Sequence, residues 1–234
     1  MRLFVIIAAC FLLLGCRSEP GSERQASRPQ EQAPPAQAPK PADTRPVIAA
    51  FGDSLTAGFG ADPGKSYPDY LQQLLDRAGY AYRVVNLGIS GDTTSGGVAR
   101  IDSVIAVNPE IVILELGAND GLRGLPPSAT RANLDEMITA LKKAGADVVL
   151  AGMTLPRNYG SQYIRDFESV FTDLARKHSV ALVPFLLAGV ADRRELMQGD
   201  GLHPTAEGNR RVAANVMKTL EPLLNKARSS NAVR

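Results

Sequence analysis

The stretch Val47–Leu55 reads VIAAFGDSL: the unbroken apolar run Val47–Phe51 is followed by a glycine, two polar residues and Leu55. Strands that are buried on both faces of a parallel sheet have this continuous apolar character, whereas half-exposed strands alternate with polar residues. Four further runs show the same character: Tyr82–Leu87, Ile111–Leu116, Val148–Gly152 and Ala181–Val183. The first stretch therefore predicts a strand of a parallel sheet that is buried on both faces, with Ser54 just beyond its carboxyl end.

Segments with helical periodicity separate these runs. Apolar side chains recur at a spacing of three and four residues in Tyr67–Leu75, Leu134–Leu141, Ile164–Leu174 and Val212–Leu223. Regular alternation of strands and helices predicts one three-layer α/β domain with right-handed crossovers. Because active sites in such sheets gather at the carboxyl ends of the strands, we expect the chemistry at that edge.

The charge and cysteine content exclude several classes of function. Residues 46–234 hold 20 basic and 20 acidic side chains, so the domain carries no field that would recruit nucleic acid, and we expect no nucleic-acid partner. The only two cysteines are Cys10 and Cys16. The domain therefore contains no disulfide, no cysteine nucleophile and no cysteine-based metal site.

The N-terminus has the features of an export signal. Arg2 precedes the apolar run Leu3–Leu14, which is too short to span a bilayer. The run ends in Leu13-Leu14-Gly15-Cys16, which resembles the lipobox of bacterial lipoproteins. The resemblance implies cleavage before Cys16 and lipidation of its side chain. An uncleaved anchor and a plain secretory peptide remain as alternatives.

This reading divides the chain into four parts. We expect a lipoprotein signal peptide at residues 1–15, and a lipidated cysteine with a disordered tether rich in proline and alanine at 16–45. A folded α/β domain at 46–226 and a flexible tail at 227–234 follow. Arg17 follows the cysteine, where an aspartate would suggest retention at the inner membrane in some bacteria. We therefore expect an exported protein, anchored at the periplasmic face of the outer membrane.

The sequence offers two histidines as a catalytic base. His178 ends a helical segment beside Lys177, where we expect an exposed surface residue. His203 lies in a loop that contains glycine, and Asp200 precedes it by three residues. A carboxylate at that spacing can reach the imidazole Nδ1–H and leave Nε2 free to take a proton. The spacing favours a catalytic pair over a structural histidine.

Ser54 is the candidate nucleophile, because it follows a strand end where its hydroxyl can be presented to such a base. Taken singly, a serine at this position is more often a turn or helix-cap residue. Gly88 and Asn119 follow the second and third predicted strands and are equally ambiguous alone. The hypothesis depends on four residues converging on one edge of one sheet: Ser54, Gly88, Asn119 and His203.

Four short blocks, taken together, resemble a known family. Gly52-Asp53-Ser54-Leu55, then Gly88, then Gly117-Ala118-Asn119-Asp120, then Asp200-Gly201-Leu202-His203 resemble the blocks of the SGNH (GDSL) hydrolases, in the order of that family. Longer matches at Ser90–Thr93, Gly117–Gly124 and Leu155–Gly160 are similar to its periplasmic multifunctional lysophospholipase, acyl-CoA thioesterase and arylesterase group. This sequence has alanine at position 118, where members of that group often have glycine.

The resemblance implies a fold and a mechanism. The fold is a three-layer α/β/α flavodoxin-like domain with a five-stranded parallel sheet. The nucleophile is Ser54, the base is His203, and Asp200 orients the base. The oxyanion hole consists of the N–H groups of Ser54 and Gly88 with the Asn119 side chain. No metal and no cofactor are needed. Six residues are implied to bind substrate: Asp53, Leu55, Asp120, Leu155, Pro156 and Tyr159.

The function expected on these grounds is hydrolysis of small-molecule acyl esters or thioesters through an acyl-enzyme. A carbohydrate O-acetyl esterase is an alternative that the same fold supports. A lipoprotein that uses the fold only for binding is a second alternative. That alternative would expect Ser54, Asn119 or His203 to be lost, and all three are present.

Overall fold

The computed structural model describes residues 43–231 and contains one parallel sheet with the strand order β2-β1-β3-β4-β5. The five strands lie close to the predicted positions, which confirms the fold class: β1 Val47–Gly52, β2 Arg83–Gly88, β3 Pro109–Glu115, β4 Asp147–Ala151 and β5 Ala181–Val183. All four pairings are parallel.

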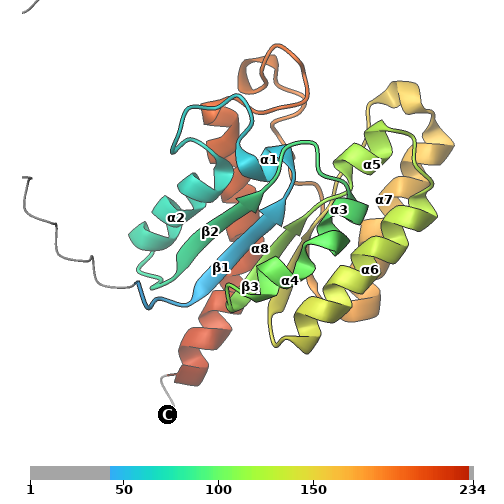
Figure 1. The fold of residues 1–234 in the computed structure, drawn as a ribbon. Coiled ribbons are helices and arrows are strands. Elements are labelled where there is room, and N and C mark those ends of the chain that lie inside the picture. The colour runs from blue at the N-terminus through green and yellow to red at the C-terminus, as the bar shows by residue number, and fades with distance from the viewer. Residues whose placement is uncertain (1–42, 232–234) are drawn as a thin grey trace, which may run out of the picture. The chain divides into compact units, whose positions relative to one another are not determined.

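Helices cover both faces of the sheet in three layers (Figure 1). One face carries two helices that pack on each other, α2 Tyr67–Arg77 and α8 Ala206–Asn231. The other carries α3 Thr94–Ala99, α4 Ile101–Ile105, α6 Pro127–Lys143 and α7 Ser161–His178. The chain leaves β1 toward β2 on one side and returns past β1 to β3 on the other. With right-handed crossovers, this reversal places the connecting helices on opposite faces and creates a switch point between β1 and β3.

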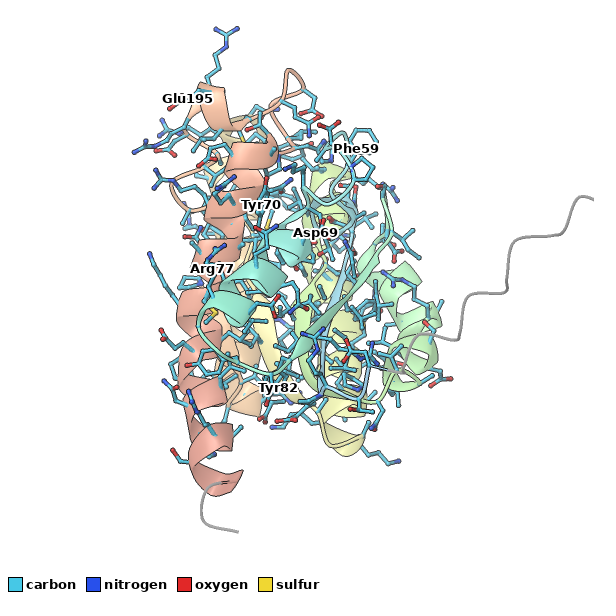
Figure 2. The ribbon with its side chains drawn as sticks, turned by 90° about the vertical axis from the view of Figure 1, so that its left-hand side faces the viewer. Phe59, Asp69, Tyr70, Arg77, Tyr82 and Glu195 are labelled. Carbon is cyan, nitrogen blue, oxygen red and sulfur yellow. The ribbon has the colours of Figure 1, made fainter. Side chains whose placement is uncertain are left out.

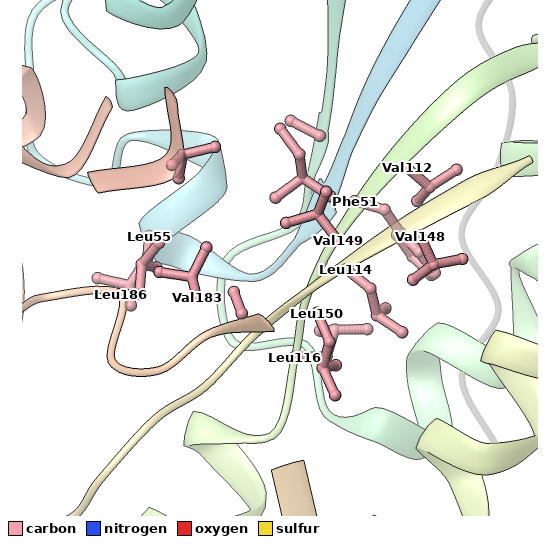
Figure 3. Close-up of a cluster of buried hydrophobic side chains, with 14 of the residues drawn as sticks. Phe51, Leu55, Val112, Leu114, Leu116, Val148, Val149, Leu150, Val183 and Leu186 are labelled. Carbon is pink, nitrogen blue, oxygen red and sulfur yellow. The ribbon is translucent and has the colours of Figure 1, made fainter. Parts of the chain in front are cut away.

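The hydrophobic core joins the buried strands β1, β3 and β4 to the inward-facing side chains of the helices. Phe51, Leu114 and Leu150 occupy neighbouring positions on these three strands, and all are buried (Figure 3). The expectation of strands buried on both faces is wrong for β2, whose six residues are all half-buried or exposed. β2 is an edge strand, and an edge strand is covered by fewer neighbours whatever its sequence.

Two short helices begin where strands end. α1 Ser54–Ala57 follows β1 after a single residue, and α5 Ala118–Leu122 follows β3 closely. Two 3₁₀ turns, η1 Arg157–Tyr159 and η2 Arg194–Leu196, lie in loops farther along the chain. The side-chain view places Phe59, just after α1, at the opposite end of the molecule from Tyr82, which precedes β2 (Figure 2). The carboxyl edge of the sheet is therefore the edge that bears Phe59.

The ends of the helices follow ordinary capping chemistry, with one departure from expectation. Ser66 and Asp69 form a reciprocal capping box at the start of α2. α8 runs through Asn231, so the predicted tail at 227–234 is wrong for its first five residues. Lys226-Ala227-Arg228 are good helix formers, and no glycine or proline follows to stop the helix.

The predicted signal segment, Cys16 and nearly all of the predicted tether lie outside the described residues. Within residues 43–231, no helix combines the length and the apolar character that a bilayer span requires.

Candidate active site

Ser54 is the first residue of α1, directly beyond β1. The Asp53 carboxylate caps this helix by accepting a hydrogen bond from the Leu55 N–H at 3.0 Å. Gly52 allows the close approach of the chain, because a Cβ there would collide with the side chains of Thr56 and Glu115. The turn from strand to helix thus presents the Ser54 hydroxyl at the carboxyl edge of the sheet.

His203 lies in a tight loop between η2 and α8. Gln198 spans this loop: its N–H donates to the His203 carbonyl at 2.7 Å, and its side-chain amide donates to Phe59 and Pro204 carbonyls. Gly201 has a φ of 68°, a left-handed conformation that glycine adopts without steric cost. The loop therefore turns sharply enough to bring Asp200 beside the imidazole.

The three predicted catalytic side chains meet in hydrogen-bonding order. The Nε2 atom of His203 lies 2.8 Å from the Ser54 Oγ, and its Nδ1 lies 2.6 Å from the Asp200 Oδ2. The Asp200 Oδ1 also accepts from the N–H groups of Leu202 and His203. The Phe59 ring packs on the imidazole at 4.6 Å between centroids. The arrangement fixes the base with Nε2 toward the serine.

The carboxylate of this array stays ionised at neutral pH. Partial burial opposes the charge on Asp200, but the hydrogen bonds from His203 and from two backbone N–H groups outweigh it and lower its pKa to about 2. An ionised partner stabilises the imidazolium that forms when His203 takes a proton.

Asn119, in the first turn of α5, points its side-chain amide toward the same region. The Nδ2 atom donates to the Asp53 Oδ2 at 3.0 Å and to the Asp92 carbonyl at 2.9 Å. Both neighbours are acceptors, so they fix which end of the amide faces them. Asn119 thereby ties the ends of β1 and β3 to the loop after β2.

The prediction that Gly88 supplies an oxyanion donor needs correction. Gly88 is the last residue of β2, where it pairs with Gly52, and its N–H donates to the Asn86 Oδ1 at 2.9 Å. A Cβ at Gly88 would collide with the backbone of Thr56 and Ala57, so its glycine allows close packing. Gly88 does not line the cavity beside Ser54, whereas Gly91 does.

Gly91 has the features that the sequence prediction gave to Gly88. Its φ of 80° turns the loop after β2 back over the sheet edge. Among the described residues, the N–H groups of Ser54 and Gly91 have no protein acceptor. The N–H groups available to an oxyanion are therefore those of Ser54 and Gly91. Both hydrogens of the Asn119 amide are bonded to Asp53 and to the Asp92 carbonyl, so its predicted donor role requires that an oxyanion replace one of these acceptors. Gly91 lies in the Ser90–Thr93 match, which is the signal that would have identified it.

A cavity of about 480 Å³ opens beside the array and is mostly apolar. Ser54, Asn119 and His203 stand at its polar side. Its apolar side chains come from five separate segments of the chain: Leu55, Phe59, Leu122, Met153, Leu155, Phe185, Leu187, Met197 and Leu202. The volume lies within the range of small-molecule sites.

The six predicted substrate-binding residues divide into two groups. Asp53, Leu55, Leu155 and Pro156 line the cavity. Asp120 does not, because its buried carboxylate accepts from the Thr94 N–H at 2.9 Å and from its hydroxyl at 2.5 Å. That residue joins α5 to α3, and direct substrate contact is the wrong role for it.

Tyr159 likewise does not line the cavity. Its hydroxyl donates to the Leu122 carbonyl at 2.7 Å, so it supports a lining residue from behind. The expectation of direct contact is wrong here as well.

Two buried carboxyl groups lie beneath the nucleophile, and the sequence analysis identified only one of them. Glu115, at the end of β3, accepts from the Asp53 N–H and from the Thr56 hydroxyl at 2.7 Å. Burial, reinforced by the nearby Asp53 carboxylate, raises the pKa of Glu115 well above its ordinary value. Burial also raises the pKa of Asp53 to about 6, against the opposing hydrogen bonds from Leu55 and Asn119. Burial therefore favours the protonated form of both carboxyl groups.

The second histidine is not at this edge. His178 ends α7, and its Nε2 lies 2.5 Å from Asp135 of α6. Its side chain is only 13% exposed, which corrects the expectation of an exposed residue. No group of three potential metal ligands occurs among the described residues.

A serine, a histidine and a carboxylate in hydrogen-bonding order, at the carboxyl edge of a parallel sheet and beside an apolar cavity, define a serine hydrolase that acts on ester bonds. The comparisons with known proteins agree. The chain belongs to the GDSL-like Lipase/Acylhydrolase family, whose sequence model matches residues 50–211.

Individual relatives are similar over most of their length. Esterase TesA of Pseudomonas aeruginosa is 45% identical over 76% of this chain and 89% of that protein. Thioesterase 1/protease 1/lysophospholipase L1 of Escherichia coli K12 is 36% identical over 76% of this chain and 85% of that protein. A crystal structure of TesA is 43% identical and superposes with a TM-score of 0.73, over 76% of this chain and 99% of that chain.

Proposed function

We propose that this esterase cleaves acyl esters of medium or long chain length through an acyl-enzyme on Ser54. The observation that carries the proposal is the apolar cavity of about 480 Å³ next to the Ser54 hydroxyl. An acetyl group would leave most of this volume unfilled, whereas each methylene of a longer chain gains about 0.8 kcal/mol on burial. Chain length should therefore decide specificity, which disfavours a carbohydrate O-acetyl esterase.

The geometry supports the following sequence of steps. The Ser54 Oγ attacks the acyl carbonyl carbon while the His203 Nε2 takes its proton. The carbonyl π electrons move to the oxygen, which becomes an oxyanion facing Ser54 N–H and Gly91 N–H. The oxyanion also takes one hydrogen of the Asn119 amide, which exchanges its bond to Asp53 or to the Asp92 carbonyl for the stronger acceptor. The oxyanion collapses, the bond to the alcohol breaks, and His203 donates its proton to that leaving oxygen.

The second half repeats these steps with water as the nucleophile. His203 takes a proton from water as the water oxygen attacks the acyl-enzyme. The tetrahedral adduct then releases the free acid, and the proton returns to the Ser54 oxygen. Asp200 remains ionised throughout and holds the imidazole in place.

A substrate panel tests this proposal. We would measure kcat/KM for p-nitrophenyl esters from acetate to palmitate, with lysophosphatidylcholine, an acyl-CoA and acetylated xylan alongside. The value should rise by up to about fourfold per added methylene until the cavity is filled, as follows from the burial energy of a methylene. Preference for acetyl esters, or cleavage of acetylated xylan above all others, would contradict the proposed specificity.

A pair of variants connects the specificity to the cavity. Leu155→Trp places bulk inside the cavity and should move the preferred chain to shorter lengths. Leu125→Trp is the matched control, because Leu125 is exposed and does not line the cavity. An unchanged chain-length profile in a folded Leu155→Trp enzyme would show that the cavity does not bind the acyl chain.

We also propose that the enzyme is exported and held to the membrane by a lipid on Cys16, at the periplasmic face of the outer membrane. The Leu13–Cys16 motif supports the anchor, and Arg17 supports the choice of membrane. Wild-type protein expressed in a bacterium should enter the detergent phase of Triton X-114, and Cys16→Ser should stay in the aqueous phase with unchanged esterase activity. A soluble wild type that begins at another residue would refute lipidation.

A further inference from the structure

Arg100 lies between α3 and α4 and uses all three guanidinium nitrogens on acceptors near the active site. Its Nε donates to the Asp92 Oδ2 at 2.7 Å, Nη1 to the Leu87 carbonyl at 2.7 Å, and Nη2 to the Gly52 carbonyl at 2.9 Å. Its guanidinium also lies over the Phe51 ring, 4.4 Å from the centroid. The planar fork of arginine satisfies such a fixed set of acceptors, which an ammonium group cannot do.

These acceptors surround the candidate oxyanion hole. The Gly52 carbonyl ends β1, two residues before Ser54, and the Leu87 carbonyl lies at the end of β2, before the loop that carries Gly91. Asp92 directly follows Gly91. Arg100 therefore fixes the loop on both sides of Gly91 and joins it to the strand that carries the nucleophile.

Asp92 extends the same linkage to the third donor. Its main-chain carbonyl accepts one hydrogen of the Asn119 amide at 2.9 Å, while its carboxylate holds Arg100 and also accepts from the Thr93 N–H. The Asp92–Arg100 pair thus contacts, or lies next to, the segments that carry all three donors.

A contribution to folding stability does not by itself account for this ion pair. The side chains of Arg100 and Asp92 are only 17% and 11% exposed. Taking two charges out of water costs as much as their attraction returns in many proteins, so buried pairs are weak evidence for a stabilising role. A role in positioning the oxyanion donors explains the pair better, because its hydrogen bonds reach the segments that carry these donors.

We propose that Arg100 and Asp92 are a positioning pair that holds the Gly91 and Asn119 donors at the site of the oxyanion. The proposal rests on the function proposed above. Neither side chain lines the cavity, so neither is a catalytic residue. Loss of the pair should displace the donors without removing them, and a displacement near 1 Å costs up to about 100-fold in rate.

The test compares Arg100→Lys, Arg100→Met and Asp92→Asn with wild type. We would measure kcat and KM for p-nitrophenyl octanoate, and the inhibition constants of an octyl trifluoromethyl ketone and of octanoate. The ketone forms a tetrahedral oxyanion adduct with the serine, whereas octanoate tests only the acyl cavity. Each variant should lose about 10- to 100-fold in kcat and in affinity for the ketone, with KM and octanoate affinity within about threefold.

The double variant Arg100→Met/Asp92→Asn should be no worse than the poorer single variant, since the two residues act as a unit. Arg131→Met is the matched control, because Arg131 forms a comparable 2.9 Å ion pair with Asp173 whose two side chains are 39% and 41% exposed, away from the cavity. That control should keep wild-type kcat within about twofold.

The outcomes separate this proposal from the proposed function. Ester hydrolysis by wild type that is lost in Ser54→Ala establishes the function independently. If that function is established, Arg100 and Asp92 variants with a lower melting temperature but normal kcat and ketone affinity would overturn only the positioning role. Should Arg100→Met fail to fold, Arg100→Lys and Asp92→Asn carry the same expectations, because both keep most of the side-chain volume.

Discussion

Replacement of Asn119 by alanine perturbs the site in a way that the structure makes quantitative. The amide donates two hydrogen bonds, one to Asp53 and one to the Asp92 carbonyl, and the first acceptor is a buried carboxyl group. A neutral hydrogen bond contributes about 1 kcal/mol, and one to a charged group about 1.5–3 kcal/mol. Asn119→Ala should therefore lower the free energy of unfolding by about 2–4 kcal/mol.

The same substitution also removes an oxyanion donor, which lowers kcat by about 10²–10³-fold in comparable enzymes. Urea unfolding would measure the stability change, and kcat would be expressed per site titrated with a fluorophosphonate. Asn119→Asp should be at least as damaging to kcat, because it places a second carboxyl group near Asp53. A folded Asn119→Ala enzyme that keeps kcat within tenfold of wild type would refute the oxyanion role.

Two further predictions follow from groups beneath the nucleophile. Asp53, with its pKa raised to about 6, contributes stability that is fully present below its unfolded pKa near 4 and is lost as the pH rises through about 6. The pKa of Glu115 is raised by the same burial, so its contribution to stability changes with pH in the same direction. Glu115→Gln cannot ionise at this position, so its free energy of unfolding should fall less than that of wild type as the pH rises above the ordinary glutamate pKa of about 4.3; parallel curves in urea titrations would contradict the raised pKa of Glu115. Gly88→Ala should lower stability by about 1–3 kcal/mol through collision with the Ala57 backbone, measured by thermal unfolding, and an unaffected melting temperature would argue against the close approach.

The local pattern of the sequence was sufficient to predict most of the fold. The run at Val47–Gly52 is continuous because β1 is an interior strand, paired with β2 on one side and β3 on the other, and is buried throughout. The Ser66 and Asp69 pair caps α2 through contacts only three residues apart, which a sequence displays directly. The spacing of Asp200 and His203 is equally local, and it predicted the geometry of that pair.

The wrong predictions concern residues whose role depends on distant segments. Gly88 remains within β2 because it pairs with Gly52, and its packing against α1 is invisible in the sequence near it. Asp120 follows a strand end as Asn119 does, but it faces Thr94, 26 residues away in sequence, and not the cavity.

Glu115 was overlooked for a related reason. It interrupts the apolar run of β3, and a single acidic residue there gives no sign that Thr56 and the Asp53 N–H will surround it. Arg100 lies in a segment between two short helices that periodicity did not detect. Residues that support a site from behind are therefore the ones that only the assembled sheet reveals.

Covalent labelling of Ser54 tests the central claim most directly. We would incubate the wild type with a fluorophosphonate probe and locate the modification by peptide mass spectrometry. The account predicts one label per chain, on Ser54, formed much more slowly in His203→Ala and absent in Ser54→Ala. Labelling of another serine, or labelling that persists in Ser54→Ala, would contradict the assignment of Ser54 as the nucleophile.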